Sequence, residues 1–292
     1  MASFLQLVIS GLATGAIYAM VAVGFTLIWQ TSQAINFAQG EFVMIPAFFI
    51  LVAMKVAGLP FLPACLVGLL VSIALLGFMF KRVVVDPMSR HGVLPLVIST
   101  IALALFLKES VKEFYSSQAQ PFPSLLPVQD LHVLGAVIST QSLLVIVVAI
   151  VTVGSLHLLL TYTRLGRQMQ ATAQNRDVAQ ILGIPVQRMI LYTFLINAAL
   201  VTIASILISP IYLAKFTNGE TLGLFAFIAA IVGGFNQVRG AIVGGLILGV
   251  VSNLCAAYIS AKYRDAFPLF LLIAVILLRP QGLVGRREER SV

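Results

Sequence analysis

A short polar run separates two apolar stretches near the start of the chain. It contains Asn36, Gln39 and Glu41, with Gly40 between the last two. Such groups cannot face lipid cheaply, since an ionisable group near the membrane midplane costs a few kcal/mol, so they must face a cavity, a partner helix or the interface. Gly40 permits a break in the helix, and a broken helix exposes backbone amides that can hold a solute. The alternative is an ordinary cytoplasmic turn in which Asn36 caps the next helix.

A second interruption lies in a glycine-rich stretch towards the C-terminus. Gly233 and Gly234 are followed at once by Asn, Gln and Arg residues within an otherwise apolar run, and this pattern predicts a helix break near a solute path. The glycines from 240 to 249 recur four residues apart. That spacing puts bare backbone along one helix face, which favours close packing of helices.

A third feature is a polar stretch with signals for a short surface helix. Asn175 can cap its start, and Asp177 complements the helix dipole in the first turn. Gly183 can end the helix in a left-handed conformation, and Pro185 prevents its continuation.

One face of this expected helix is apolar, because Val178, Ile181 and Leu182 fall together at helical spacing. A protruding helix with an apolar face fits a groove on another protein. The alternative is a helix that lies on lipid headgroups through Arg167 and Arg176.

The composition indicates what kind of fold must position these groups. Hydrophobic residues make up 60% of the 292 positions and charged residues only 10%, which leaves too little polar surface to cover a soluble globule. The mean hydropathy is +1.05. Runs such as 62–80 and 142–160 carry no charge, and about 20 apolar residues cross the hydrocarbon core. We therefore expect an all-α, polytopic transmembrane helical bundle.

The apolar pattern predicts eight or nine membrane segments, some of them broken or re-entrant. They lie near residues 4–29, 41–57, 62–80, 93–112, 139–162, 187–211, 221–235, 240–261 and 266–279. The segments at 221–235 and 266–279 are short, and this makes the number of crossings approximate. Residues 4–29 are expected to be a helix rather than a signal peptide, because no basic residue precedes them.

The net charge of +8 would suggest nucleic acid in a soluble chain, but here the basic residues are confined to connections between apolar runs. Three regions are rich in them. The first holds Lys81, Arg82 and Arg90 in one loop, the second Arg164, Arg167, Arg176 and Arg188, and the third Arg279, Arg286, Arg287 and Arg290. The positive-inside rule places all three in the cytoplasm, with the N-terminus outside. A single membrane domain, 1–292, follows, with an outer loop at 113–138 and a cytoplasmic loop at 163–187.

The chain resembles the permease subunits of branched-chain amino acid ABC importers of the LivH type over nearly its whole length. The matching motifs are Gly11-Leu-x-x-Gly15-x-x-Tyr18, Ile35-Asn36-Phe37-Ala38 with Gly40-Glu41, Gly166-Arg167 with Ala171-x-Ala173 through Leu182-Gly183-Ile184, Gly233-Gly234 to Gly249, and Arg279-Pro280-Gln281-Gly282-Leu283-x-Gly285. At Gln39 the chain departs from the family, in which many members have a histidine.

The resemblance implies a multi-pass subunit of the bacterial inner membrane that lacks enzymatic activity and cofactors of its own. It implies a second, related permease as heterodimer partner, two cytoplasmic ATPase subunits that bind ATP, and a periplasmic solute-binding protein. It also implies that residues 171–184 form the coupling helix. The expected coupling residues are Ala173, Asn175, Arg176, Asp177, Val178, Ile181, Leu182 and Gly183. Members of the family handle leucine, isoleucine and valine, and others urea, short amides or small carboxylates.

Two other classes of protein, a self-sufficient transporter or channel and an intramembrane enzyme, fit the sequence less well. A self-sufficient secondary transporter or channel would not need a coupling helix, and a proton- or sodium-driven carrier usually has acidic groups within its spans, where only Glu41 qualifies. An intramembrane enzyme is disfavoured because the three histidines are scattered and no metal-ligand spacing or nucleophile elbow occurs. The chain also lacks the Gly-x4-Gly-Lys-Ser/Thr phosphate cradle, so ATP hydrolysis is expected in partner subunits.

Overall fold

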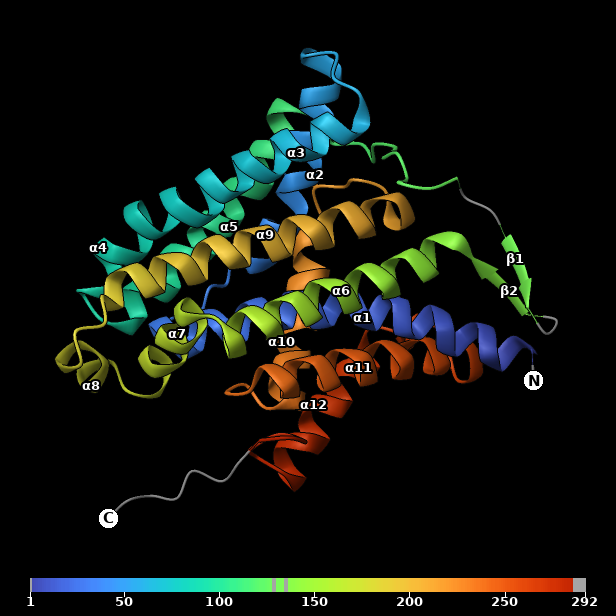
Figure 1. Ribbon diagram of the computed structural model, residues 1–292. Helices are drawn as coiled ribbons and strands as arrows, with labels where there is room; N and C mark the ends of the chain where they lie inside the picture. The colour runs from blue at the N-terminus through green and yellow to red at the C-terminus, as the bar shows by residue number, and fades with distance from the viewer. Residues whose placement is uncertain (1, 128–129, 134–135, 286–292) are drawn as a thin grey trace. The chain divides into compact units, whose positions relative to one another are not determined.

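The computed structural model describes residues 2–127, 130–133 and 136–285 (Figure 1). The predicted cytoplasmic arginines Arg286, Arg287 and Arg290, and part of the predicted outer loop 113–138, lie outside these residues. The elements are α1 (Ala2–Ser32), α2 (Gln39–Val56), α3 (Phe61–Ser72), η1 (Ile73–Met79), η2 (Lys81–Val85), α4 (Asp86–Ser89), α5 (Val93–Phe114), β1 (Asp130–Val133), β2 (Ala136–Ser139), α6 (Thr140–Tyr162), α7 (Arg164–Gln174), α8 (Arg176–Ile181), α9 (Val186–Tyr212), α10 (Asn218–Gly233), α11 (Val238–Tyr258), η3 (Ala261–Tyr263) and α12 (Ala266–Leu278).

The predicted all-α transmembrane bundle is confirmed. Within the described residues, seven helices are long and apolar enough to cross a membrane. They are Phe4–Ser32, Gln39–Val56, Phe61–Ser89, Val93–Phe114, Thr140–Tyr162, Val186–Tyr212 and Val238–Tyr258. Two shorter apolar helices, Asn218–Gly233 and Ala266–Leu278, coincide with the two segments that the sequence marks as short. The expected eight or nine segments are thus approximately right.

The chain divides into two compact units. The first comprises 1–26, 126–147 and 224–292, and the second comprises 27–125 and 148–223.

In the first unit, glycines bring α1 and α11 into backbone contact. A Cβ atom on Gly11 would lie 2.8 Å from Cα of Val250, and one on Gly15 would lie 2.8 Å from the carbonyl oxygen of Gly245. No side chain larger than hydrogen fits at that separation. The close packing predicted for the glycines between 240 and 249 is therefore confirmed, and its counterpart is the glycine pair of α1.

The first unit also uses its C-terminal segment to complete α10. The N–H groups of Leu283 and Val284 donate to the carbonyl oxygens of Val232 (2.9 Å) and Gly233 (3.0 Å). The last carbonyls of a helix have no partner within the helix, so these two bonds satisfy groups that would otherwise be left unpaired. Gly282, at φ +80°, allows the chain to turn into this position.

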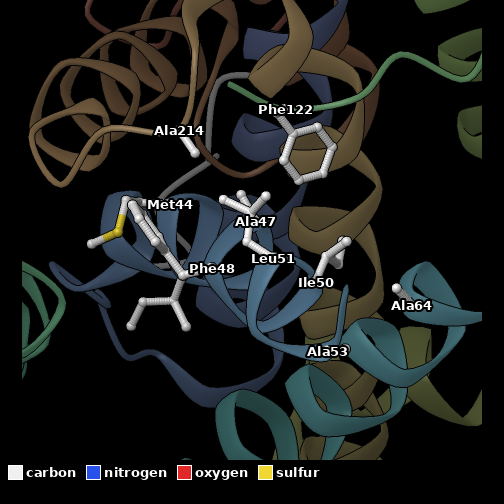
Figure 2. Close-up of a cluster of buried hydrophobic side chains, with 10 residues drawn as sticks. Met44, Ala47, Phe48, Ile50, Leu51, Ala53, Ala64, Phe122 and Ala214 are labelled. Atoms are coloured by element: carbon white, nitrogen blue, oxygen red, sulfur yellow. The ribbon is translucent and has the colours of Figure 1, made fainter. Parts of the chain in front are cut away.

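In the second unit, α2 packs with α3, α5 and α9, and α3 and α9 lie side by side (Figure 1). Its C-terminal half carries an apolar cluster that includes Phe48, Ile50 and Leu51, and Ala64 of α3 and Phe122 close it from outside the helix (Figure 2). This cluster anchors one end of α2, whereas the other end, from Gln39 to Glu41, is polar and equally buried.

Pro46 lies inside α2 and lacks an N–H group, so it perturbs the hydrogen bonds of the turn around it. The N–H group of the next residue, Ala47, donates to the hydroxyl of Ser205 in α9 at 3.1 Å. A hydroxyl of a neighbouring helix thus accepts from a backbone donor of α2, as expected where no water is available.

One prediction about the basic residues is wrong. Lys81 and Arg82 were expected in a loop with Arg90, but the helix that begins at Phe61 continues through π-helical turns to Ser89, and Arg90 lies at its end. The helix can continue because the Lys81 ammonium group is buried and paired: it lies 2.9 Å from the Asp86 carboxylate and donates to the Gln187 side chain at 3.3 Å.

The predicted outer loop contains more order than its composition suggests. Gln120 pairs with Ala214 in an isolated antiparallel bridge within the second unit, and Lys55 donates to the Gln120 side chain at 3.2 Å. In the first unit, β1 and β2 form an antiparallel pair with Asp130 opposite Ser139.

Candidate functional site

The centre of the second unit is a reciprocal amide pair between α2 and α9. Gln39 donates from Nε2 to Oδ1 of Asn197 at 2.7 Å, and Asn197 donates from Nδ2 to Oε1 of Gln39 at 3.0 Å. Both side chains are fully buried. Asn197 lies about 16 Å along α9, at about 1.5 Å per residue from Val186. Since Gln39 is the first residue of α2, that helix begins close to the midpoint of α9 rather than at its end.

Asn36 ties the segment before α2 to this pair. Its Oδ1 accepts from the N–H group of Ala38 at 3.0 Å, and its Nδ2 lies 3.4 Å from Oε1 of Gln39. Asn36 is only 3% exposed, and the residue at the N-cap position of α2 is Ala38, which makes no side-chain cap. Asn36 is therefore not the N-cap residue of α2, although its amide accepts a backbone N–H group just before the helix, and the cytoplasmic side of this turn remains a prediction. Asn36 thus links the residues before α2 to the buried amide pair.

Gly40 allows α2 to touch the first turns of α10. A Cβ atom on Gly40 would lie 2.9 Å from Cα of Gly223 and would meet the backbone of Gly219 even more closely. Conversely, a Cβ atom on Gly223 would lie 2.8 Å from Cα of Gly40. The helix break that the sequence predicts at Gly40 is found just before it, between Ser32 and Gln39, and the glycine itself serves this backbone contact.

Glu41 completes the polar group. It is 3% exposed, and its Oε2 atom has no hydrogen-bond partner among the residues that the structure describes. Its carboxylate sits where a Cβ atom on Gly219 would be, against the first turn of α10. Glu220, the next residue of α10, pairs with Lys108 of α5 at 2.6 Å. The structure thus brings Asn36, Gln39, Gly40 and Glu41 together, as their sequence proximity suggests, and adds groups from three other helices.

Three aromatic rings flank the amide pair. Phe42 and Phe80 stack edge to face with ring centroids 4.9 Å apart, and Phe80 and Phe194 do so at 5.7 Å. Phe42 follows Gln39 by three residues and Phe194 precedes Asn197 by three, so each ring lies on the same helix face as an amide. An apolar surface therefore borders the polar one.

The sequence did not single out Asn197, Thr100 or Ser205. Thr100 of α5 accepts from the N–H group of Phe37 at 3.3 Å, and Ser205 binds α2 as described. All three are buried polar residues in apolar helices. Their position as single polar residues within apolar segments could have identified them from the sequence, because a polar side chain within a membrane segment must find a partner inside the protein.

Gly233 and Gly234 belong to the first unit. The predicted break between two helices is present there, since α10 ends at Gly233 and Gly234 adopts φ +116°. Gly233 packs against Gly240, and Gly234 against the segment that contains Gly282 and Gly285. Their place on a solute path remains a prediction.

The surface helix expected between Asn175 and Gly183 is α8, and a second helix, α7, precedes it. α7 contains Ala173 and ends at Gln174, and α8 begins at Arg176. Asn175 adopts an extended backbone between them, and its Oδ1 accepts from the N–H group of Val178 at 3.0 Å. The predicted cap is confirmed, whereas the single helix from 171 to 184 is wrong, because an N-cap residue requires non-helical backbone angles.

The end of α8 and its apolar face agree with the prediction. Gly183 adopts φ +78°, in the left-handed region that favours glycine. Val178 and Leu182 are exposed, and Ile181 is 84% exposed. These large apolar side chains are exposed at the end of a polar connection, and their contact with a partner remains a prediction.

Two charged residues begin α8. Asp177 lies in the first turn, where its charge favours the helix dipole. The Arg176 guanidinium is half-buried, and this burial lowers its pKa, an effect that the adjacent Asp177 partly opposes. Its Nη2 atom has no hydrogen-bond partner within the described part of the chain.

The described residues contain no group of three or more His, Cys, Asp and Glu side chains placed to hold a metal ion. The arrangement is instead a set of hydrogen-bonding groups between membrane helices. It can bind and release a polar solute if α2, α9 and α10 move relative to one another.

Comparison with known proteins gives a consistent result. Residues 7–276 match the family model described as "Branched-chain amino acid transport system / permease component". The chain is 34% identical over 303 residues to the high-affinity branched-chain amino acid transport system permease protein LivH of Escherichia coli K12, covering 99% of this chain and 98% of that protein. It is 33% identical over 301 residues to BraD of Pseudomonas aeruginosa, with the same coverage. A solved structure, PsaBC from Streptococcus pneumoniae in complex with Fab, superposes with a TM-score of 0.47 and 17% identity over 94% of this chain and 90% of that one.

Proposed function

Since the chain belongs to the family of branched-chain amino acid transport system permease components, a family of multi-pass membrane proteins, we propose that it forms one membrane subunit of an ATP-driven importer. The solute is a branched-chain amino acid or a related small polar molecule. The subunit resides in the bacterial inner membrane and moves its solute by alternating access, without a cofactor or catalytic residue of its own.

The observation that carries the proposal is the buried amide pair of Gln39 and Asn197. It lies about midway along a helix long enough to span the bilayer, in an otherwise apolar surrounding. Both amides satisfy each other in this closed arrangement. A solute with donors and acceptors can replace that pairing, so opening the contact offers a polar binding site at mid-membrane depth.

A continuous mechanical connection supports the coupling role of α8. The chain passes from α8 through Gly183 and Pro185 directly into α9, which contacts both α7 and α8 (Figure 1). Asn197 lies on α9 and holds Gln39 of α2. A push on α8 by a cytoplasmic partner would therefore shift α9 and strain the amide pair, because a helix moves as a rigid rod over so short a distance.

An importer of this kind needs three kinds of partner protein. Two ATPase subunits bind ATP, and one of them receives the exposed face of α8, with Val178, Ile181 and Leu182 as its apolar contacts. A second, related permease completes the membrane part, and a periplasmic binding protein delivers the solute. The family match and the relatives named as amino acid permeases support this assembly.

Substitution of Leu182 by Asp tests the proposal. Leu182 is 71% exposed, so the change spares the subunit's own packing and places a charge in the proposed docking surface. We expect co-purification of the ATPases to fall, or leucine uptake to lose its dependence on ATP hydrolysis. Gln180→Asp is the matched control, because Gln180 is exposed on another face of the same helix and should leave uptake unchanged.

Coupled, ATP-dependent uptake at the wild-type level in the Leu182→Asp variant would contradict the docking role. Uptake by this chain in the absence of any ATPase subunit would favour a self-sufficient transporter instead.

A further inference from the structure

We propose that Glu41 provides the negative charge that binds the ammonium group of the transported solute, and thereby selects amino acids over neutral amides and simple carboxylates. This inference rests on the proposed function, since it assigns a substrate class to that same site. It begins from a carboxylate that is 3% exposed and has an unpartnered Oε2 atom within the described residues.

The ordinary structural role of a glutamate at this position is already filled. Glu41 is the third residue of α2, where a glutamate side chain normally reaches back to accept from the N–H group of the N-cap residue. That residue is Ala38, and its N–H group donates instead to Oδ1 of Asn36 at 3.0 Å. The Glu41 carboxylate is therefore not needed to cap its own helix.

The neighbouring charges do not neutralise Glu41 either. Lys108 is a cation whose charge acts on Glu41, but the Lys108 ammonium group is engaged at 2.6 Å with Glu220. When all three groups are ionised, the two carboxylates and one ammonium carry one net negative charge. Since a buried charge is costly unless it is paired, a further cation beside Glu41 would stabilise its ionised form.

The shape of the surroundings suits a primary ammonium group with an apolar body. The Glu41 carboxylate lies against Gly219, and Gly40 contacts the same residue, so bare backbone borders the charge and leaves no side chain to obstruct a small molecule once the helices part. The rings of Phe42 and Phe80 lie on the same part of α2 and its neighbour η1–η2. Glu41 supplies a charge for an ammonium group, and the next residue of α2, Phe42, supplies apolar surface for an aliphatic side chain, the two parts of a branched-chain amino acid.

Other solutes fit less well. A neutral amide brings no charge to balance Glu41, and a carboxylate without an amine would be repelled by it in a medium of low dielectric constant. The charge of Glu41 thus favours binding of compounds that carry an ammonium group.

Competition with labelled leucine for binding tests this selectivity for an ammonium group. The membrane subunits and their ATPases are purified without the periplasmic binding protein, and leucine bound to them is displaced by leucinamide, which keeps the ammonium group, or by 4-methylpentanoate, which lacks it. We expect wild type to prefer leucinamide by about tenfold or more, as charge-assisted hydrogen bonds allow. Glu41→Gln keeps the shape of the side chain and should remove that preference.

Glu109→Gln is the matched control, because Glu109 is exposed and pairs with Lys112 within α5, so its loss should leave the preference unchanged. Glu41→Asp retains the charge and should retain part of the preference, which guards against loss of folding as the explanation. A Glu41→Gln complex that still prefers leucinamide overturns the inference and leaves the proposed function standing. A wild-type complex that transports only solutes without an ammonium group overturns the inference alone, and one that transports no small polar solute with ATP overturns the proposed function and this inference with it.

Discussion

Single side chains decide how α2 is held. An amide buried without a partner loses its hydrogen bonds to water and gains nothing in return, so Gln39 and Asn197 depend on each other. Removing either one leaves the other unsatisfied, whereas removing both leaves only a small space. The two residues should therefore act as a unit.

A double-mutant cycle at these positions measures that dependence. Gln39→Ala and Asn197→Ala should each lower the unfolding free energy, and the double variant should lose less than their sum, with a coupling energy of about 0.6 to 1.7 kcal/mol, as found for hydrogen bonds between membrane helices. Thermal unfolding of the purified complex gives the stabilities, and leucine uptake gives the function. Wild-type uptake in the double variant would remove these amides from the solute path.

At the scale of helices, the contact between α2 and α10 leaves no room for a side chain. Gly40 and Gly223 face each other with backbone atoms in contact. Such close contact fixes the relative position of the two helices in this conformation, because interiors of proteins are packed as tightly as molecular crystals.

Substitution of Gly40 by Ala tests this contact. The added methyl group would overlap the backbone of Gly219 and Gly223, and overpacking of this kind costs about 1–3 kcal/mol. We expect a lower melting temperature and reduced uptake. Gly154→Ala in α6 is the matched control, since a Cβ atom there meets nothing within 4 Å and alanine favours the helix, so stability should be unchanged or slightly higher.

At the scale of the whole chain, the sequence predicts the helices well and their ends less well. Apolar runs must be helical in a membrane, and this requirement located the seven candidate spans found in the described residues. It could not show that the helix from Phe61 passes Lys81, because the partner Gln187 that accepts from the buried lysine is more than a hundred residues away. Asn197 was missed for the same reason: its importance depends on Gln39, which only the fold brings near.

The placement of charges predicts the orientation of the chain. Arg164, Arg167 and Arg176 lie between α6 and α9, and the positive-inside rule puts this connection in the cytoplasm. We expect alkaline phosphatase fused after Gln174 to be inactive in intact bacteria and the enzyme fused after Gln118 to be active, since it folds only outside the cytoplasm. The opposite pair of activities would reverse the proposed orientation and remove α8 from reach of the ATPases.

The sequence separation of the two amides also matters while the protein is being synthesised. Gln39 and Asn197 are 158 residues apart, so the glutamine leaves the ribosome long before its partner exists. At about 5–20 residues per second, the delay is about 8–30 s. During that interval the polar start of α2 has to remain beside water, another subunit or the insertion machinery. Nascent chains halted before Asn197 should therefore cross-link from Gln39 to the insertion machinery, and chains halted well after the end of α9 should not.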